Sequence, residues 1–164
     1  MTPLVETPTL VRPLTRDDFA SLAALATELA AHHGDEHAPA ASALERDHGG
    51  WYEARLARTT GGHDLGFVTW LRFYVSQCAE RGMEVRNLFV KTDARGRGIG
   101  RALLRAAAQA ALAADCQRLR LGVRKDNAVG VRFYKQLGCA MLDMGGSWGC
   151  RWGRDGIVDL AEKT

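Results

Sequence analysis

The chain has 164 residues, of which 46% are hydrophobic and 25% are charged, and its formal net charge is +3. This length and composition are typical of one globular domain with a single core, so we predict one domain over residues 1–164. No apolar run approaches the roughly 20 residues that span a bilayer, and the charge lacks the dense basic stripe of a nucleic-acid-binding protein. We therefore expect neither a membrane nor a nucleic acid as partner.

The N-terminus and the cysteines favour a cytoplasmic protein. Residues 1–6 lack the basic and then apolar layout of a signal peptide. Neither C-x-x-C nor zinc-type spacing occurs among the cysteines, which are Cys78, Cys116, Cys139 and Cys150. Reduced thiols are therefore expected, and disulfides are not.

The N-terminal third predicts a strand followed by helices. Residues 10–13 are expected as a first strand, and residues 17–31 as a helix with Thr15 as its N-cap. The buried face of that helix is expected to consist of Phe19, Leu22, Leu25 and Leu29. A loop is expected over residues 32–39, and residues 40–58 are predicted to be mostly helical with a break near Gly49 and Gly50.

Strands and helices alternate in the rest of the chain. Gly61 and Gly62 predict a hairpin turn into a long strand over 65–76, and a second strand is expected over 83–90. An alanine-rich helix starts at Ile99 and its apolar stripe reaches Leu112. The remaining expected elements are a strand over 118–123, a short helix ending at Gly138, and final strands over 139–144 and 150–153.

The residues between the strand 83–90 and the alanine-rich helix form an arginine- and glycine-rich loop, Arg95–Arg101. Alternate glycines let a ligand approach the backbone closely, and the start of a helix offers unpaired N–H groups and a partial positive charge. Arg95, Arg97 and Arg101 add guanidinium groups, which bind phosphate oxygens well. The loop therefore predicts a site for a di- or triphosphate group.

Two common phosphate-binding motifs do not match this loop. A P-loop requires Lys-Ser or Lys-Thr after the glycines, and the loop contains neither pair. A dinucleotide fingerprint requires a third glycine where Arg101 stands, and it usually opens the first βαβ unit of a chain.

The motif R-x-x-G-x-G does match, through Arg95, Gly98 and Gly100. It resembles the pyrophosphate-binding motif of the GNAT superfamily of N-acetyltransferases, which bind acetyl-CoA. About thirty residues later, Asn127 follows a strand and precedes a short helix with Phe133-Tyr134, as in the second motif of that superfamily. Two motifs at the expected separation identify the chain as similar to GNAT enzymes.

The resemblance is strongest to the diamine (spermidine/spermine-type) N-acetyltransferase branch and spans nearly the whole chain. It implies an α/β GNAT fold, with a mixed and mostly antiparallel central sheet flanked by helices, and a homodimer. One departure concerns the substrate, because polyamine acetylators of this branch usually carry an acidic pair where this chain has Arg86-Asn87. A guanidinium there would repel a polycation, so the substrate is not inherited with the fold.

The resemblance also implies roles for individual residues in acetyl-CoA binding. Leu88, Phe89 and Val90 would pair with the pantetheine arm, and a backbone N–H of this segment would bind the thioester carbonyl. Asn127 would contact the cofactor arm. The remaining cofactor-binding residues would hold the pyrophosphate and are Arg95, Gly96, Arg97, Gly98, Ile99, Gly100 and Arg101.

Transfer of an acetyl group to an amine also requires an acid and a base. Tyr134 matches the tyrosine near the sulfur in the family, where its hydroxyl would protonate the departing thiolate; a purely packing role is the alternative. Glu84 is the predicted general base, and the alternative is a strand-end carboxylate paired with Arg72, Arg81 or Arg86. Cys-linked acyl transfer is not expected, because no cysteine has a motif partner.

The acceptor is expected to be the primary amine of a small molecule. Asp35 and Glu36 are predicted to attract a cationic amine, or else to lie in a solvated loop. Arg86 suggests an acceptor that carries a carboxylate beside its amine, unless its side chain points outward. His33 and His37 are four residues apart, but Gly34 would interrupt a helix between them, and we predict no metal site.

Two other functions share the same cofactor loop. A peptide or protein N-acetyltransferase would differ by a wide acceptor groove and by activity on peptides. A non-catalytic acetyl-CoA sensor would bind acetyl-CoA and show no amine-dependent release of thiol. The acceptor and the general base are not decided by the sequence.

Overall fold

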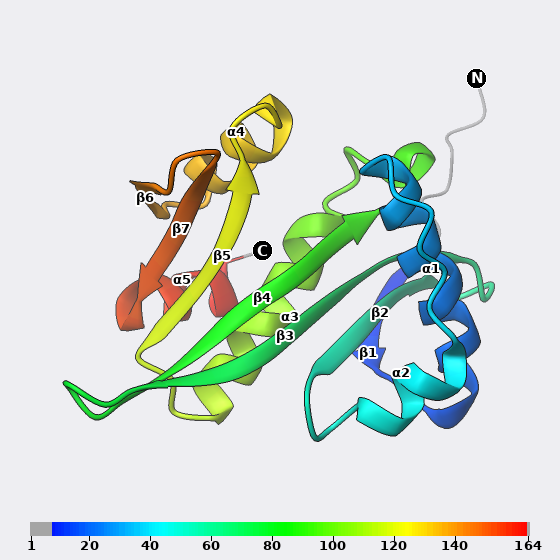
Figure 1. The fold of residues 1–164 in the computed structure, drawn as a ribbon, viewed down its shortest axis with the longest axis horizontal. Coiled ribbons are helices and arrows are strands. Elements are labelled where there is room, and N and C mark those ends of the chain that lie inside the picture. The colour runs from blue at the N-terminus through cyan, green and yellow to red at the C-terminus, as the bar shows by residue number, and fades with distance from the viewer. Residues whose placement is uncertain (1–7, 164) are drawn as a thin grey trace. The chain divides into compact units, whose positions relative to one another are not determined.

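The computed structural model describes residues 8–163, and its elements are labelled in Figure 1. The chain divides into two compact units. The first contains the residues up to Val68 together with Leu88–Leu103, and the second contains Thr69–Asn87 together with the residues from Leu104 onward. The boundaries fall inside β3 (Asp64–Val75), β4 (Glu80–Val90) and α3 (Ile99–Ala113), which therefore contribute to both units.

The described strands form a seven-stranded sheet in the order β1-β2-β3-β4-β5-β7-β6. The pair β4–β5 is parallel, and the pairs β1–β2, β5–β7 and β6–β7 are antiparallel. The predicted α/β fold with a mixed, mostly antiparallel sheet is confirmed. The remaining strands are β1 (Thr9–Pro13), β2 (Glu53–Thr59), β5 (Arg118–Arg124), β6 (Ala140–Asp143) and β7 (Ser147–Gly153).

The first unit packs a helix against its strands. Helix α1 (Phe19–His32) follows a short 3₁₀ turn, η1 (Arg16–Asp18), and α2 is Ala41–Asp47. A second short 3₁₀ turn, η2 (Thr92–Ala94), follows β4. Every third or fourth residue of α1 faces the core, as an amphipathic helix requires. The buried cluster consists of Phe19, Leu22, Leu25, Ala54, Leu56, Phe67 and Phe89.

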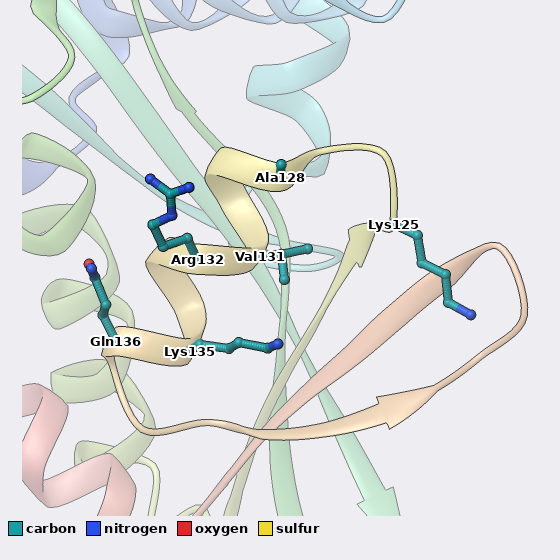
Figure 2. Close-up of a pocket in the computed structure, with 6 residues that line it drawn as sticks. All are labelled: Lys125, Ala128, Val131, Arg132, Lys135 and Gln136. Carbon is teal, nitrogen blue, oxygen red and sulfur yellow. The ribbon is translucent and has the colours of Figure 1, made fainter.

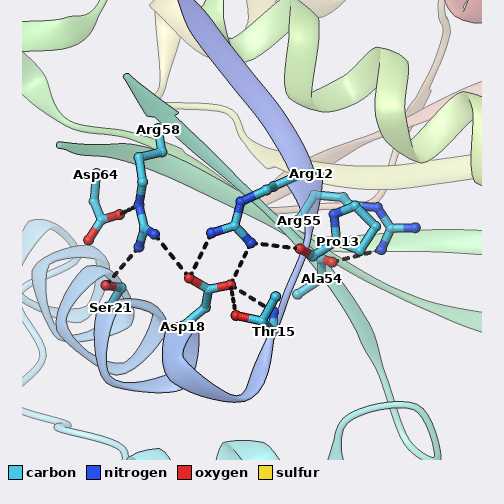
Figure 3. A network of polar contacts seen from close by, with 9 residues as sticks. All are labelled: Arg12, Pro13, Thr15, Asp18, Ser21, Ala54, Arg55, Arg58 and Asp64. Atoms are coloured by element: carbon cyan, nitrogen blue, oxygen red, sulfur yellow. Dashed lines mark hydrogen bonds and ion pairs between the residues drawn. The ribbon is translucent and has the colours of Figure 1, made fainter. Parts of the chain in front are cut away.

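A buried carboxylate joins three elements of the first unit (Figure 3). Asp18 accepts two hydrogen bonds from Arg12 of β1, at 2.6 and 3.0 Å, and one from Arg58 of β2 at 3.0 Å. It also accepts from the backbone N–H of Thr15 at 2.7 Å and from the Thr15 hydroxyl at 2.9 Å. Thr15 is therefore the N-cap of η1, with Asp18 as its capping-box partner, whereas the N-cap of α1 is Asp18 and not the predicted Thr15.

The second unit has its core under one face of its strands. Leu119, Leu121 and Val123 alternate with polar residues along β5, and all three are buried. Helix α4 (Ala128–Gln136) contacts β5, and α5 (Arg154–Glu162) contacts β5 and β7. The indole Nε1 of Trp152 donates to the carbonyl of Leu137 at 3.0 Å, which ties β7 to the end of α4.

The structure corrects one further expectation and adds one element. Residues 40–58 are not mostly helical, because the helix ends at Asp47 and Glu53–Thr59 form β2. Ala54 and Leu56 of β2 are buried at alternate positions, and residues 55–59 pair with β1; this pairing overrides the helix propensity of the segment. Helix α5 was not expected. Among the described residues, no helix is long and apolar enough to cross a membrane.

Candidate functional site

The predicted phosphate loop connects η2 to α3 in the first unit. Gly96 and Gly98 have φ values of +77° and +76°, in the left-handed region that favours glycine. Ile99 is buried and anchors the first turn of α3, and the N–H of Ala102 donates to the Gly98 carbonyl at 3.0 Å. The glycines thus turn the chain directly into the N-terminus of a long helix, where backbone N–H groups face outward.

The three arginines of this loop lack carboxylate partners in the described part of the chain. Arg95 donates to the Val90 carbonyl at 2.9 Å, and Arg97 donates to the Asp93 carbonyl at 3.0 Å. All three side chains, including Arg101, belong to exposed residues. Most other arginines in residues 8–163 form ion pairs, so this loop concentrates positive charge that no acidic side chain neutralises.

The segment Leu88–Val90 precedes this loop at the end of β4. Phe89 is buried, and its ring centroid lies 6.1 Å from that of Phe67 and 6.5 Å from that of His32 at the end of α1. Gly66 of β3 approaches the segment so closely that a Cβ there would lie 2.3 Å from the Phe89 carbonyl oxygen. The backbone of this segment is therefore fixed by packing on both its side chain and its carbonyl group.

Strands β4 and β5 separate within the second unit. Their described pairing runs from Gly82–Arg118 to Glu84–Arg120 and ends there, although β5 continues to Arg124. Beyond Glu84, the edge of β4 that faces β5 has backbone groups without a strand partner in this unit. Such an edge is suited to an extended ligand with amide groups, which pairs with it as an added strand would.

Glu84 lies at the last paired position and is held by two arginines. Arg86 donates to its Oε1 at 2.5 Å and Arg120 donates to its Oε2 at 2.7 Å. Burial raises the pKa of Glu84, but the hydrogen bonds from Arg86 and Arg120 outweigh it, so the pKa lies below its ordinary value. The structure therefore brings Glu84 and Arg86 together as an ion pair. Glu84 is a weaker base in this arrangement than a solvated glutamate.

Helix α4 follows Asn127, its N-cap, and contains Tyr134. The Asn127 Oδ1 accepts from the N–H of Gly130 at 2.9 Å, so Asn127 caps the helix. Tyr134 is buried, with its ring 6.4 Å from that of Trp152. Burial raises the pKa of Tyr134, with smaller contributions from the neighbouring thiols of Cys150 and Cys139. Its hydroxyl is therefore protonated at neutral pH.

The end of α4 follows the prediction for Gly138. This glycine has a φ of +75°, and its N–H donates to the Lys135 carbonyl at 3.1 Å. The N–H of Cys139 donates to the Tyr134 carbonyl at 3.5 Å, which completes a Schellman motif. The motif fixes the turn of helix that carries Tyr134.

A basic pocket beside α4 was not predicted (Figure 2). Its volume is about 550 Å³, and it is lined by Lys125, Ala128, Val131, Arg132, Lys135 and Gln136. Lys125 pairs with Asp143 at 2.6 Å, whereas Arg132 and Lys135 form no ion pair within residues 8–163. Their spacing of three residues on a helix was the signal in the sequence. The pocket is suited to an anionic group.

The loop after α1 carries the acidic residues expected to attract an amine. Asp35 and Glu36 are exposed, and Asp35 pairs with His37 at 3.4 Å. In the residues that the structure describes, no group of three or more His, Cys, Asp or Glu side chains is arranged to hold a metal ion.

Comparisons with known proteins give a consistent picture. A family model described as "Acetyltransferase (GNAT) family" matches residues 17–139. Thialysine N-epsilon-acetyltransferase from Bos taurus is 33% identical over 92 residues, which are 56% of this chain and 54% of that protein. The chain thus spans about half the length of the curated relatives that it matches.

Solved structures share the fold over most of the chain. Spermidine N-acetyltransferase from Vibrio cholerae, solved in complex with CoA and spermine, has a TM-score of 0.73 and 15% identity, and the match covers 92% of this chain and 98% of that chain. Ribosomal-protein-alanine N-acetyltransferase from Brucella melitensis biovar Abortus 2308 has a TM-score of 0.68 and 25% identity, with coverages of 84% and 96%. At 15% identity the first likeness shows the fold alone.

Proposed function

The chain belongs to the acetyltransferase (GNAT) family, and from this premise we propose that it transfers an acetyl group from acetyl-CoA to the primary amine of a small molecule. The observation that carries the proposal is the loop Arg95–Arg101, where three exposed arginines without carboxylate partners in the described residues occur at the start of a helix. A polyanionic cosubstrate supplies the negative charge that this loop lacks. The solved relative with CoA and the pocket of α4 also support it.

We assign the residues of the first unit to cosubstrate binding. The N–H groups at the start of α3, with Arg95, Arg97 and Arg101, hold the pyrophosphate. A backbone N–H of Leu88–Val90 donates to the thioester carbonyl and stabilises the negative charge that develops there during attack. The tight packing of Gly66 and Phe89 fixes the position of that backbone.

We assign Asn127 and Tyr134 of the second unit to the cosubstrate arm and the leaving sulfur. The acceptor attacks directly, in a ternary complex, so the thiolate leaves as the new amide forms. Tyr134 is protonated at neutral pH, and we assign its hydroxyl to give a proton to the thiolate. Burial raises its pKa and makes it a weaker acid than a solvated tyrosine, so this role depends on its placement beside the sulfur. The acceptor must be neutral to attack, and an ammonium group has a pKa of about 10.4.

Glu84 has a different role in this proposal from the predicted one. Its lowered pKa disfavours removal of a proton from an ammonium group at neutral pH. We propose that Glu84 orients Arg86 and Arg120 and that the acceptor loses its proton to water. Assembly as a homodimer and a cytoplasmic location stay predictions.

The acceptor is tested by release of CoA thiol from acetyl-CoA with a panel of amines. The panel contains spermidine, lysine-type amino acids and short peptides, because relatives are named for thialysine, spermidine and ribosomal-protein alanine. Turnover of a small amine supports the proposal. Turnover of peptides alone favours a protein N-acetyltransferase, for which the relative from Brucella melitensis is the supporting observation. Acetyl-CoA binding with no amine-dependent release identifies a sensor.

A further inference from the structure

One face of the sheet in the second unit is polar and rich in arginine. Along β5, Arg118, Arg120 and Arg124 alternate with the buried Leu119, Leu121 and Val123. The buried side is the one that the helices of this unit cover, since Trp152, which pairs with Leu119, contacts the end of α4. In Figure 1, α5 and much of α3 lie behind β4, β5 and β7.

Three arginines and one carboxylate lie next to one another on this polar face, and the carboxylate pairs with two of the arginines. Glu84 of β4 pairs in register with Arg120 of β5, which pairs in register with Arg151 of β7. Arg86 also reaches Glu84. We call Glu84, Arg86, Arg120 and Arg151 the arginine row. Its formal charge is +2, from three guanidinium groups and one carboxylate.

Arg151 lacks an acidic partner in the register of the described strands. Its in-register partners are Arg120 on one side and Ala140 on the other, and Gly149 and Gly153 lie two positions away along its own strand. Within residues 8–163 it forms no ion pair. Like charges directly opposite one another destabilise a sheet. Repulsion between Arg120 and Arg151 therefore lowers the stability of the protein without ligand.

The surroundings of the row leave room for a ligand. The guanidinium of Arg120 lies 3.9 Å from the centroid of the Phe73 ring and is held by Glu84, so its position is fixed before anything binds. Gly122 follows Arg120 on the same face, and an added Cβ there would meet no described atom within 4 Å. Next to the two guanidinium groups, the sheet therefore presents open backbone.

We propose that Arg120 and Arg151 bind a carboxylate of the acceptor, so that the substrate is an amine that also carries an anionic group. This inference rests on the proposed function and names its substrate class. Guanidinium groups match a carboxylate in geometry and charge, and a carboxylate at Arg151 balances the row. Arg86 lies two positions before Leu88 along the sequence of β4. A polycation is disfavoured by the same charges.

The test compares two amines that differ in the carboxylate. Lysine and 1,5-diaminopentane share the chain that bears the reacting amine, and only lysine has a carboxylate. We expect wild-type kcat/KM to favour lysine, and Arg151→Gln to lower kcat/KM for lysine about tenfold, mainly through KM, because one charge-assisted contact is lost. For 1,5-diaminopentane, Arg151→Gln is expected to keep or raise kcat/KM, because one repelling charge is removed, and retained turnover of this amine also shows that the variant is folded.

Arg124→Gln is the matched control, because Arg124 lies on the same face of β5 with its guanidinium paired to Asp126 at 2.6 Å. It should leave both kcat/KM values unchanged. Equal loss for both amines in Arg151→Gln, or a wild-type preference for 1,5-diaminopentane, overturns the inference and leaves the proposed function intact.

Absence of thiol release with every amine would contradict the proposed function instead. In that case, calorimetric titration with Nε-acetyllysine and N-acetyl-1,5-diaminopentane would test anion binding by the arginine row separately from catalysis. Tighter binding of acetyllysine that is lost in Arg151→Gln supports the anion site, and equal binding of the two compounds overturns it.

Discussion

At the scale of single residues, we expect kcat to depend on the hydroxyl of Tyr134. Tyr134→Phe keeps the buried ring against Phe133 and Trp152 and removes only the proton donor. We expect kcat to fall about 100-fold or more, as for loss of a general acid, with an unchanged Kd for acetyl-CoA. Tyr74→Phe, at an exposed tyrosine of β3, is the control. Turnover within twofold of wild type would leave Tyr134 a packing residue.

Asp18 is expected to make stability depend on pH. Hydrogen bonds from Arg12 hold its pKa well below the ordinary value, against burial, and Thr15 adds to this effect. A carboxyl group with a lowered pKa stabilises the fold above its unfolded pKa of about 3.9, and this contribution is lost as pH falls through lower values. Asp18→Asn should lower the free energy of unfolding by about 3 kcal/mol at pH 7, because it breaks a buried ion pair.

Urea unfolding of wild type and Asp18→Asn at pH 7, 4 and 3 checks this expectation. The difference between the two proteins should shrink by about 1 kcal/mol per pH unit below pH 4. Asp126→Asn is the control, since Asp126 forms an ion pair with Arg124 at the surface, and its effect should be small at each pH. A difference that stays constant from pH 7 to pH 3 would contradict the assignment to ionised Asp18.

At the scale of elements, the approach of β3 to β4 depends on Gly66. An alanine Cβ there would lie 2.3 Å from the Phe89 carbonyl oxygen and 3.1 Å from the Val90 Cα, and both are backbone atoms. We expect Gly66→Ala to cost about 1–3 kcal/mol of stability and to lower kcat by displacing Leu88–Val90. Urea unfolding and the thiol assay measure the two effects.

Gly122→Ala is the matched strand glycine for stability, because an added Cβ at Gly122 meets no described atom within 4 Å. Its effect on unfolding should stay within about 0.5 kcal/mol. Equal free energies of unfolding for Gly66→Ala and Gly122→Ala would show that the β4 backbone can shift at Phe89 and is not fixed there.

The elements that the sequence predicts well are those whose signals are local. The turn at Gly96 and Gly98 and the C-cap at Gly138 depend on a few adjacent residues, and the structure has both. Strand β2 was missed because alanine, leucine and arginine favour a helix, and its strand form depends on pairing with the distant β1. Helix α5 shows buried Ile157, Leu160 and Ala161 at helical spacing, but Gly156 in its first turn weakens the signal.

The residues of the candidate site also divide into those with a local signal and those whose contacts depend on distant residues. Arg95, Gly98 and Gly100 are recognised from their spacing alone. The ion pairs of Glu84 are not, because Arg120 lies 36 residues away and reaches Glu84 only through the register of β4 with β5. Without the strand register, the sequence does not say which of several arginines pairs with Glu84. The pKa of Glu84, and therefore its strength as a base, cannot be predicted either.

For the whole molecule, one cooperative domain is favoured because β3, β4 and α3 each contribute residues to both compact units. The boundaries between the compact units fall after Val68, Asn87 and Leu103, within β3, β4 and α3. A helix that crosses such a boundary keeps its hydrogen-bonded turns only while both parts are folded. We therefore expect one unfolding transition, with coincident far-ultraviolet circular dichroism and tryptophan fluorescence curves and equal calorimetric and van't Hoff enthalpies. Two separated transitions would contradict the prediction of a single domain over residues 1–164.

Acetyl-CoA should raise the midpoint temperature of that single unfolding transition. A ligand at 100 times its Kd adds about 2.7 kcal/mol to the free energy of unfolding, which for a chain of this size raises Tm by about 5–11 °C. Arg97→Ala combined with Arg101→Ala should remove most of this shift, because both guanidinium groups lack other ionic partners among the described residues. Arg46→Ala is the control, since Arg46 is exposed and pairs with Asp47 at 2.8 Å, and it should keep the full shift. A full shift in the double variant would mean that the charge of the loop is not what binds acetyl-CoA.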